Sequence, residues 1–212
     1  AQSFTVSASG ANTYSLNGAS SPGTFVVNPS STTSYSITGT STAGCANTTA
    51  VVSTVTAVGL PTITAASGSI CNGQVFNLSP GGATSYSING TSATVFTVNP
   101  SSSTAYTVSG TNAAGCTSTL SAVGDVTVNA IPTVTVNSGT ICSGQVFTMV
   151  PGGANTYSIN GVSASVFTVN PGVNTSYSIT GTSSAGCANT LAAVSAVSVN
   201  TSPTITASSG SI

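Results

Sequence analysis

The side chains of this sequence that could form covalent bonds with one another are five cysteines: Cys45, Cys71, Cys116, Cys142 and Cys187. Cys71 and Cys116 are separated by 45 residues, and so are Cys142 and Cys187. This equal spacing favours one disulfide within each repeated unit, Cys71 with Cys116 and Cys142 with Cys187. A metal site is the competing interpretation, but two cysteines without a nearby histidine or carboxylate do not complete a zinc centre. Disulfides in turn predict an oxidising, extracellular location.

Cys45 is left unpaired within the chain by the same counting, because its expected partner would precede Ala1. The next cysteine of the series would likewise follow Ile212. Two interpretations stay open. Residues 1–212 are a window on a longer tandem array, or they form a subunit whose C-terminal strand, residues 203–212, inserts into the incomplete first domain of the next copy. In the second interpretation the assembly strand contains Pro203, Thr204, Ile205, Thr206, Ala207 and Ile212.

The residues that usually carry catalysis are almost absent. The chain has no Lys, Arg or His, and Asp125 is its only acidic residue, so the formal net charge is -1. General acid–base catalysis, paired carboxylates and calcium sites all need more titratable groups than this. We therefore predict no enzymatic activity, no cofactor and no metal. The lack of basic side chains also excludes ordinary nucleic-acid binding, and no apolar run is long enough to predict membrane insertion.

An internal repeat of about 71 residues must position these cysteines. All six Phe and all six Tyr fall at four recurring places: Phe4, Phe76 and Phe147; Tyr14, Tyr86 and Tyr157; Phe25, Phe96 and Phe167; Tyr35, Tyr106 and Tyr177. Pro61, Pro132 and Pro203 open successive units. The predicted domains are residues 1–59, which lack the first strand, then 60–130 and 131–201. Residues 202–212 are predicted to be the first strand of a next repeat.

Each unit has the pattern of short β-strands. Runs such as PTVTV, TYSI and SVFTV combine β-branched and aromatic residues and are separated by Gly, Pro, Asn and Ser. The Asn-Gly pair in YSING is typical of a tight hairpin turn. AGCANTLAAVSAV has weak helical character, but it leads into VSVN, so strand is the preferred interpretation. About seven strands per unit predict an all-β tandem array of small immunoglobulin-like antiparallel sandwiches that form a fibre.

The aromatic residues are predicted to lie in the sandwich cores. The Tyr set that precedes SITGT in the sequence resembles a tyrosine corner. A glycan-binding platform built from the same rings is the alternative. Glycosylation sequons occur at Asn47, Asn77, Asn89, Asn174 and Asn200, but they do not recur in register and carry no prediction.

The phrases CNGQVFNLSPGGATSYSING, VFTVNPSSSTAYTVSGTNAAGC and PTVTVNSGTICSGQ resemble a known repeat type. They are similar to the tandem Ig-like or PKD-like repeats of very large secreted surface proteins of Bacteroidota, including gliding-associated adhesins exported by the type IX system. The resemblance spans the whole chain, although this chain lacks the usual charge and shows no sorting domain. It implies a stalk-like role at the cell surface.

We therefore expect a structural subunit or segment of an extracellular filament or stalk. Its partners would be copies of itself, joined head to tail, and the low charge predicts easy lateral bundling. The alternative is a cell-surface adhesin that binds glycans or a host surface through its loops.

Overall fold

The computed structural model describes residues 3–211, and all the regular secondary structure in this range is β-strand. The all-β prediction is therefore confirmed. The chain divides into two compact units: Ala1–Thr64, Pro80–Thr94 and Val108–Ala122 form unit 1, and Ala65–Ser79, Val95–Thr107 and Val123–Ile212 form unit 2. The limits predicted for the repeats remain a prediction. Between residues 3 and 211 no helix is long and apolar enough to cross a membrane.

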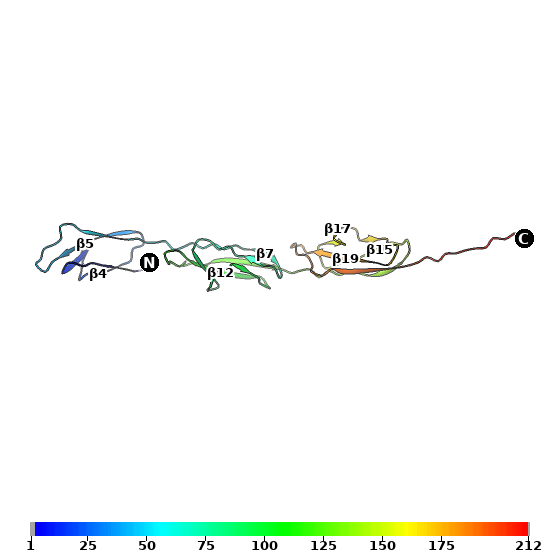
Figure 1. The fold of residues 1–212 in the computed structure, drawn as a ribbon, viewed down its shortest axis with the longest axis horizontal. Helices are drawn as coiled ribbons and strands as arrows, with labels where there is room; N and C mark the ends of the chain where they lie inside the picture. Colours follow the sequence, from blue (N-terminus) through cyan, green and yellow to red (C-terminus); the bar gives the residue numbers. More distant parts are fainter. Residues whose placement is uncertain (1–2, 212) are drawn as a thin grey trace. The chain divides into compact units, whose positions relative to one another are not determined.

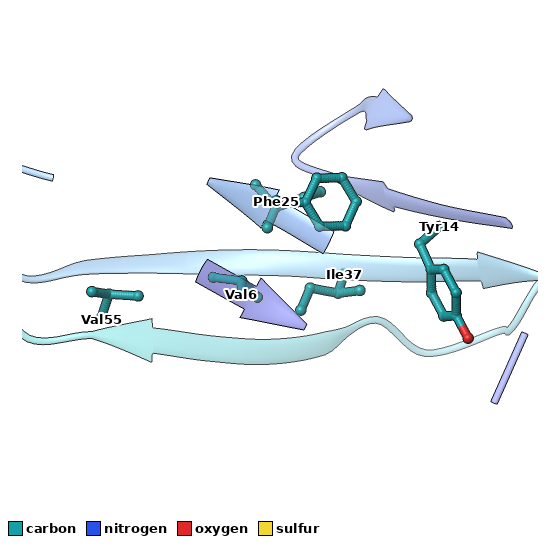
Figure 2. Close-up of a cluster of buried hydrophobic side chains, with 6 residues drawn as sticks. Val6, Tyr14, Phe25, Ile37 and Val55 are labelled. Atoms are coloured by element: carbon teal, nitrogen blue, oxygen red, sulfur yellow. The ribbon is translucent and has the colours of Figure 1, made fainter. Parts of the chain in front are cut away.

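The first repeat lies in unit 1 and has two layers (Figure 1). Its strands are β1 (Phe4–Ser7), β2 (Thr13–Leu16), β3 (Ala19–Ser21), β4 (Thr24–Val27), β5 (Thr33–Thr40) and β6 (Val51–Val55). One layer is the antiparallel sheet β3-β2-β5-β6, and the other is the ribbon β1-β4. Figure 2 shows the core between them, which contains Val6, Tyr14, Leu16, Phe25, Ile37 and Val55. In this sheet β6 is an edge strand.

The third repeat lies in unit 2 and has one strand more in its main sheet. Its strands are β14 (Gly139–Cys142), β15 (Phe147–Thr148), β16 (Thr156–Ile159), β17 (Val162–Ala164), β18 (Thr168–Val169), β19 (Thr175–Thr182) and β20 (Ala193–Asn200). The sheet order is β14-β20-β19-β16-β17, with the ribbon β15-β18 opposite. Here β14 pairs with β20 in parallel, so the last strand of the repeat is no longer at the edge. Val134, Met149 and Ile179 form the buried core.

The second repeat has the same seven strands in the same order. They are β7 (Gly68–Cys71), β8 (Phe76–Asn77), β9 (Ser85–Ile88), β10 (Thr91–Ala93), β11 (Thr97–Val98), β12 (Thr104–Thr111) and β13 (Ala122–Asn129). Within unit 2, β7 pairs with β13 in parallel, and within unit 1, β9 pairs with β10 and β12. The strand pattern therefore recurs at the predicted period, and AGCANTLAAVSAV leads into strand β20 and not into a helix.

The Asn-Gly hairpins adopt the predicted turn. Asn17, Asn89 and Asn160 have φ values of 48°, 49° and 48°, and the glycine after each also has a positive φ. Two successive positive φ values give the turn whose twist matches that of the strands. The Oδ1 atom of Asn160 also accepts a hydrogen bond from the backbone NH of Ser178, 2.9 Å away.

In the first and third repeats every aromatic ring except Phe4 packs in or against the core, as predicted. Tyr157 and Phe167 meet edge to face, with 5.8 Å between ring centroids. The Tyr157 hydroxyl donates to the Ala154 carbonyl at 2.9 Å and accepts from the Ala154 NH at 3.0 Å. Tyr14 and Tyr86 make the equivalent contacts with the residue three positions earlier. The tyrosines with this bond to the backbone are therefore Tyr14, Tyr86 and Tyr157, which are not the set that precedes SITGT.

Candidate assembly site

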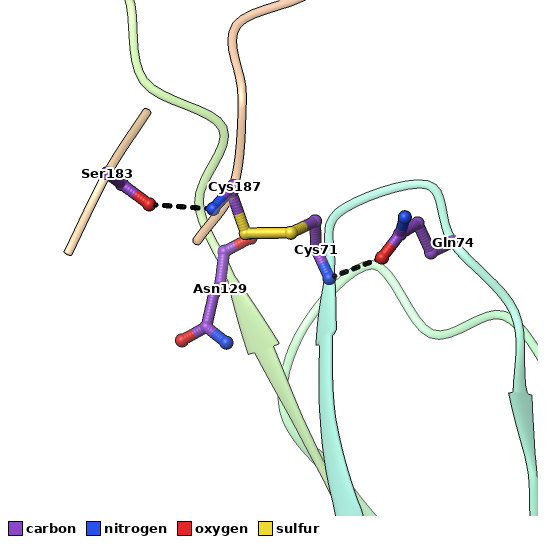
Figure 3. Close-up of a disulfide and its surroundings, with 5 residues drawn as sticks. All are labelled: Cys71, Gln74, Asn129, Ser183 and Cys187. Carbon is purple, nitrogen blue, oxygen red and sulfur yellow. Dashed lines mark hydrogen bonds between the residues drawn. A yellow bond between two sulfur atoms is a disulfide. The ribbon is translucent and has the colours of Figure 1, made fainter. Parts of the chain in front are cut away.

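A disulfide joins Cys71 to Cys187, whose Cα atoms are 5.6 Å apart although 116 residues separate them in the sequence (Figure 3). The expected pairs, Cys71 with Cys116 and Cys142 with Cys187, are therefore wrong. Cys116 and Cys142 are free thiols, as is Cys45. The bridge connects the opening strand of the second repeat to a loop of the third.

The direction of the strands explains why cysteines of one repeat do not pair. β14 runs parallel to β20 and places Cys142 opposite Asn200, at the C-terminal end of β20. Cys187 follows β19, which is antiparallel to β20 and ends beside its beginning. The eight residues of β20 span roughly 25 Å, whereas a disulfide needs Cα atoms within about 7 Å of each other. Cys142 and Cys187 thus lie at opposite ends of one sheet.

Each half of the bridge is held by two hydrogen bonds to the backbone of its cysteine. On one side, the Cys71 NH donates to Oε1 of Gln74 at 3.1 Å, and the Gln74 NH donates to the Cys71 carbonyl at 3.0 Å. On the other side, the Cys187 NH donates to Oγ of Ser183 at 3.1 Å, and the Ser183 NH donates to the Cys187 carbonyl at 2.8 Å. The Cys187 side chain is fully buried, and its Sγ lies 4.0 Å from the Asn129 carbonyl oxygen. The bridge therefore ties the opening strand of the second repeat to the loop that follows β19 in the third.

The opening segment of the third repeat, residues 132–142, closes one side of its sandwich. Thr135 and Gly152 exchange backbone hydrogen bonds of 3.0 and 2.9 Å. The buried Ser195 hydroxyl donates to the Asn137 carbonyl at 2.7 Å, and the Ala196 NH donates to Oγ of Ser138 at 3.0 Å. Strand β14 then completes the sheet beside β20. The segment is thus part of the sandwich and not a linker.

Two side-chain contacts fix this segment further. A methyl group of Val134 fits against Gly181, where an added Cβ would lie 2.9 Å from Cγ2 of Val134. Gly139 lies under the Phe147 ring, since a Cβ there would be 2.5 Å from Cε2. The second repeat repeats both contacts, with Ile63 against Gly110 and with Gly68 under Phe76.

The first repeat has a groove in the corresponding place. The groove measures about 750 Å³, and its lining includes Val6, Ala11, Tyr14, Gly39, Asn47 and Val51. Gly39 corresponds to Gly110 and Gly181, but the three nearest atoms to a Cβ built there belong only to Ala11 and Tyr14. Phe4, which corresponds to Phe76 and Phe147, is 52% exposed. Gly39 in this groove and the exposed Phe4 are therefore the residues that correspond to the two contact points of the opening segment in the other repeats.

The predicted assembly strand lies in an exposed stretch. Residues 201–211 contain no strand, and each of them is exposed, Ile205 by 89%. Pro203, Thr204, Ile205, Thr206 and Ala207 belong to this stretch, while Ile212 lies outside the described residues. Residues 203–212 repeat the sequence of residues 61–70 except that Ser208 replaces Ala66. In this alignment Ile205 takes the place of Ile63 and Val134, and Gly210 takes that of Gly68 and Gly139.

The described residues do not form a metal-binding cluster. No group of three or more His, Cys, Asp or Glu side chains within residues 3–211 is arranged to hold a metal ion. Asp125, the one carboxylate side chain, lies on strand β13 and is exposed. Its backbone NH donates to Oγ of Ser67 at 2.9 Å, as the Ala196 NH does to Ser138, so the contact belongs to the repeat and not to the carboxylate.

Comparison with known proteins found no matching family model and no matching curated protein. Solved structures with a similar arrangement include three immunoglobulin domains of titin, at 12% identity and a TM-score of 0.43, covering 94% of this chain and 92% of that one. They also include a Ca²⁺-stabilized adhesin with which an Antarctic bacterium binds ice, at 17% identity and a TM-score of 0.36, covering 95% of this chain and 69% of that one. A third is from a 1.5-MDa bacterial ice-binding adhesin, at 17% identity and a TM-score of 0.34, covering 90% of this chain and 86% of that one.

Proposed function

We propose that this chain is a non-catalytic structural segment of an extracellular surface filament or stalk, and that its copies join head to tail by strand complementation. Residues 203–212 of one copy occupy the groove on the first repeat of a second copy. The observation that carries this proposal is the match between the groove and the segment. Residues 132–142 fill the equivalent place in the third repeat, and residues 203–212 have the same sequence pattern but are exposed.

The contacts expected in the groove follow from those of the third repeat. Ile205 would pack against Gly39 as Val134 packs against Gly181, and Gly210 would lie under Phe4 as Gly139 lies under Phe147. Residues 210 and 211 would extend the sheet in parallel along β6, whose backbone is otherwise an unprotected edge. Burial of Ile205 alone would contribute roughly 2 kcal/mol.

An extracellular location is supported by the disulfide, because such bridges persist in oxidising compartments. A structural role is also favoured over glycan binding by the aromatic side chains. Eleven of the twelve Phe and Tyr residues are buried or half-buried, and the exposed one is Phe4. Its exposure is accounted for by the proposed contact with Gly210, so the chain offers no exposed cluster of rings on which a sugar could stack.

The test is the assembly state of the full chain in reducing buffer, measured by sedimentation velocity. The unsubstituted protein is expected to form polymers. Ile205→Asp and Gly210→Val are expected to remain monomeric, since the first buries a charge in the groove and the second collides with Phe4. Both positions are exposed in the free chain, so neither substitution affects its folding. The matched controls are Ile205→Val and Ser211→Ala, which should assemble normally.

A synthetic peptide of residues 203–212 provides the complementary measurement. It should bind to the Ile205→Asp chain, whose groove is intact, and a peptide with valine in place of Gly210 should not. Polymers that form equally well with Ile205→Asp, or the absence of peptide binding, would contradict the proposal. Denaturing, reducing mass analysis of the natural filament identifies the source of the segment: 20.2 kDa chains indicate a second copy, and a far larger covalent chain indicates a neighbouring repeat of the same polypeptide.

A further inference from the structure

We propose that Cys142 of one copy forms a disulfide with Cys45 of the next copy, so that the donated strand is locked covalently. The inference rests on the proposed function, because the register of the donated segment brings the two thiols together. It identifies the partner of two cysteines that are free and exposed in the single chain.

Cys142 makes the same hydrogen bonds as Cys71, which is part of the disulfide, and the same turn follows it. The Cys142 NH donates to Oε1 of Gln145 at 3.1 Å, and the Gln145 NH donates to the Cys142 carbonyl at 3.0 Å. These distances equal those between Cys71 and Gln74. The turn that follows has the same backbone as well, since Gly144 has a φ of 85° and Gly73 one of 84°. One half of a second junction bridge is therefore preformed.

Cys45 in turn makes the same two hydrogen bonds as Cys187. The Cys45 NH donates to Oγ of Ser41 at 3.2 Å, and the Ser41 NH donates to the Cys45 carbonyl at 2.9 Å. The preceding Gly44 has a φ of 80°, against 82° for Gly186 in the bridged loop. Cys187 is fully buried beside its partner, whereas Cys45 is exposed. The other half of the bridge is thus also preformed, on the first repeat.

The register of the repeats sets these halves opposite each other. Cys71 lies 61 residues before Pro132, which begins the opening segment of the repeat that carries Cys187. Cys142 lies the same 61 residues before Pro203. If residues 203–212 occupy the groove of a second copy as residues 132–141 occupy the third repeat, then Cys45 takes the place of Cys187. Cys116 lies in the same kind of loop, but residues 203–212 contain no cysteine that could face it.

Formation of the bridge requires a disulfide oxidant, for which glutathione disulfide serves in the test. The Cys45 thiolate attacks this disulfide and releases one glutathione thiolate, which leaves a mixed disulfide on Cys45. The Cys142 thiolate then attacks the Cys45 sulfur and releases the second glutathione thiolate. The two cysteine protons pass to the two glutathione thiolates, so one disulfide is consumed and one is formed.

The experiment compares assembly with covalent linkage in the full chain. Each protein is assembled in a glutathione redox buffer, sedimented under native conditions and then analysed by denaturing, non-reducing electrophoresis. The unsubstituted chain and Cys116→Ser should give a ladder of multiples of 20.2 kDa that reductant removes. Cys142→Ser and Cys45→Ser should sediment as polymers but run as single chains. A mixture of these two variants should give covalent dimers and nothing larger, because each chain keeps only one of the two thiols and can link to one neighbour.

The outcomes separate the two proposals. Polymers of the unsubstituted chain that run as single chains without reductant would overturn the disulfide and leave strand donation intact. A ladder that persists in Cys142→Ser or in Cys45→Ser would also overturn it, since other cysteines would then form the link. If no polymer sediments under any condition, strand donation fails, and the bridge that depends on it fails with it.

Discussion

Gly139 lies so close beneath the ring of Phe147 that a Cβ atom at position 139 would be 2.5 Å from the ring Cε2 atom. Gly68 and Phe76 repeat this relationship, with 2.7 Å between the corresponding positions. The φ of Gly139 is not in the left-handed region, so the glycine is required by the ring and not by the backbone. Close contact of this strand with the opposite layer therefore depends on the absence of one side chain.

Gly139→Val is expected to destabilise the third repeat by about 2 kcal/mol, because the ring or the strand must move to relieve the overlap. Thermal unfolding of the full chain measures the effect as a lowered Tm. Gly172→Ala is the control, since a Cβ there meets no atom within 4 Å. An unchanged Tm for Gly139→Val would show that Phe147 is free to swing aside.

Tyr157→Phe should lower the stability of the third repeat by about 1–2 kcal/mol. The substitution removes a hydroxyl that both donates to the Ala154 carbonyl and accepts from its NH, and it leaves these partly buried groups without that partner. Guanidinium unfolding measures the loss. Tyr177→Phe provides the comparison from the other tyrosine set and should cost less; equal losses for both variants would contradict the role assigned to Tyr157.

Removal of the bridge by Cys71→Ser is expected to destabilise the two repeats that it joins. Closure of a loop of 116 residues is worth roughly 4–5 kcal/mol in the chain-entropy model. The variant is best compared within the Ile205→Asp chain, so that assembly does not contribute. Limited thermolysin digestion should cut Cys71→Ser between residues 129 and 132 faster than it cuts Cys45→Ser. Equal rates would show that packing alone holds this junction.

The stability of the chain should be nearly independent of ionic strength. With a single charged side chain, no pair of side chains can form an ion pair for salt to screen. We expect the Tm in 10 mM and in 200 mM NaCl to agree within about 1 °C, whereas one lost ion-pair network would shift it by several degrees.

Low charge also predicts that assembled filaments associate side by side. Light scattering of the assembled protein in the same two buffers should show this bundling at both salt concentrations. Filaments that stay single at low salt would argue against lateral association.

The strands and turns could be predicted from the sequence because their signals are local. Asn160 and Gly161 mark a hairpin whatever surrounds them, and alternation in TSYSITGT predicts strand β19 by itself. The contacts of Gly139 and Gly181 could not be predicted, because they depend on which ring or methyl group approaches from the opposite layer. The sequence does contain one signal for these contacts: a glycine recurs at the same position inside a strand pattern, which often marks the close approach of another group.

The prediction of the cysteine pairs is wrong for a reason specific to repeats. A partner 45 residues away and a partner 116 residues away differ by one period of 71, so both fit the sequence spacing equally well. Only the direction of the opening strand decides between them. Because β14 is parallel to β20, Cys142 lies at the far end of the sheet from Cys187. Periodicity contains no information about that direction.

The parallel pairing of β14 with β20 also determines how the third repeat responds to mechanical tension. A pull on the two ends of this repeat acts on the start of β14 and on the end of β20, which lie at opposite ends of the same ladder. The strands are then loaded in shear, and their hydrogen bonds must break together rather than one after another. An antiparallel pair pulled from one end would instead unzip. The direction of a single four-residue strand therefore makes the repeat resistant to stretching, as the proposed filament would require.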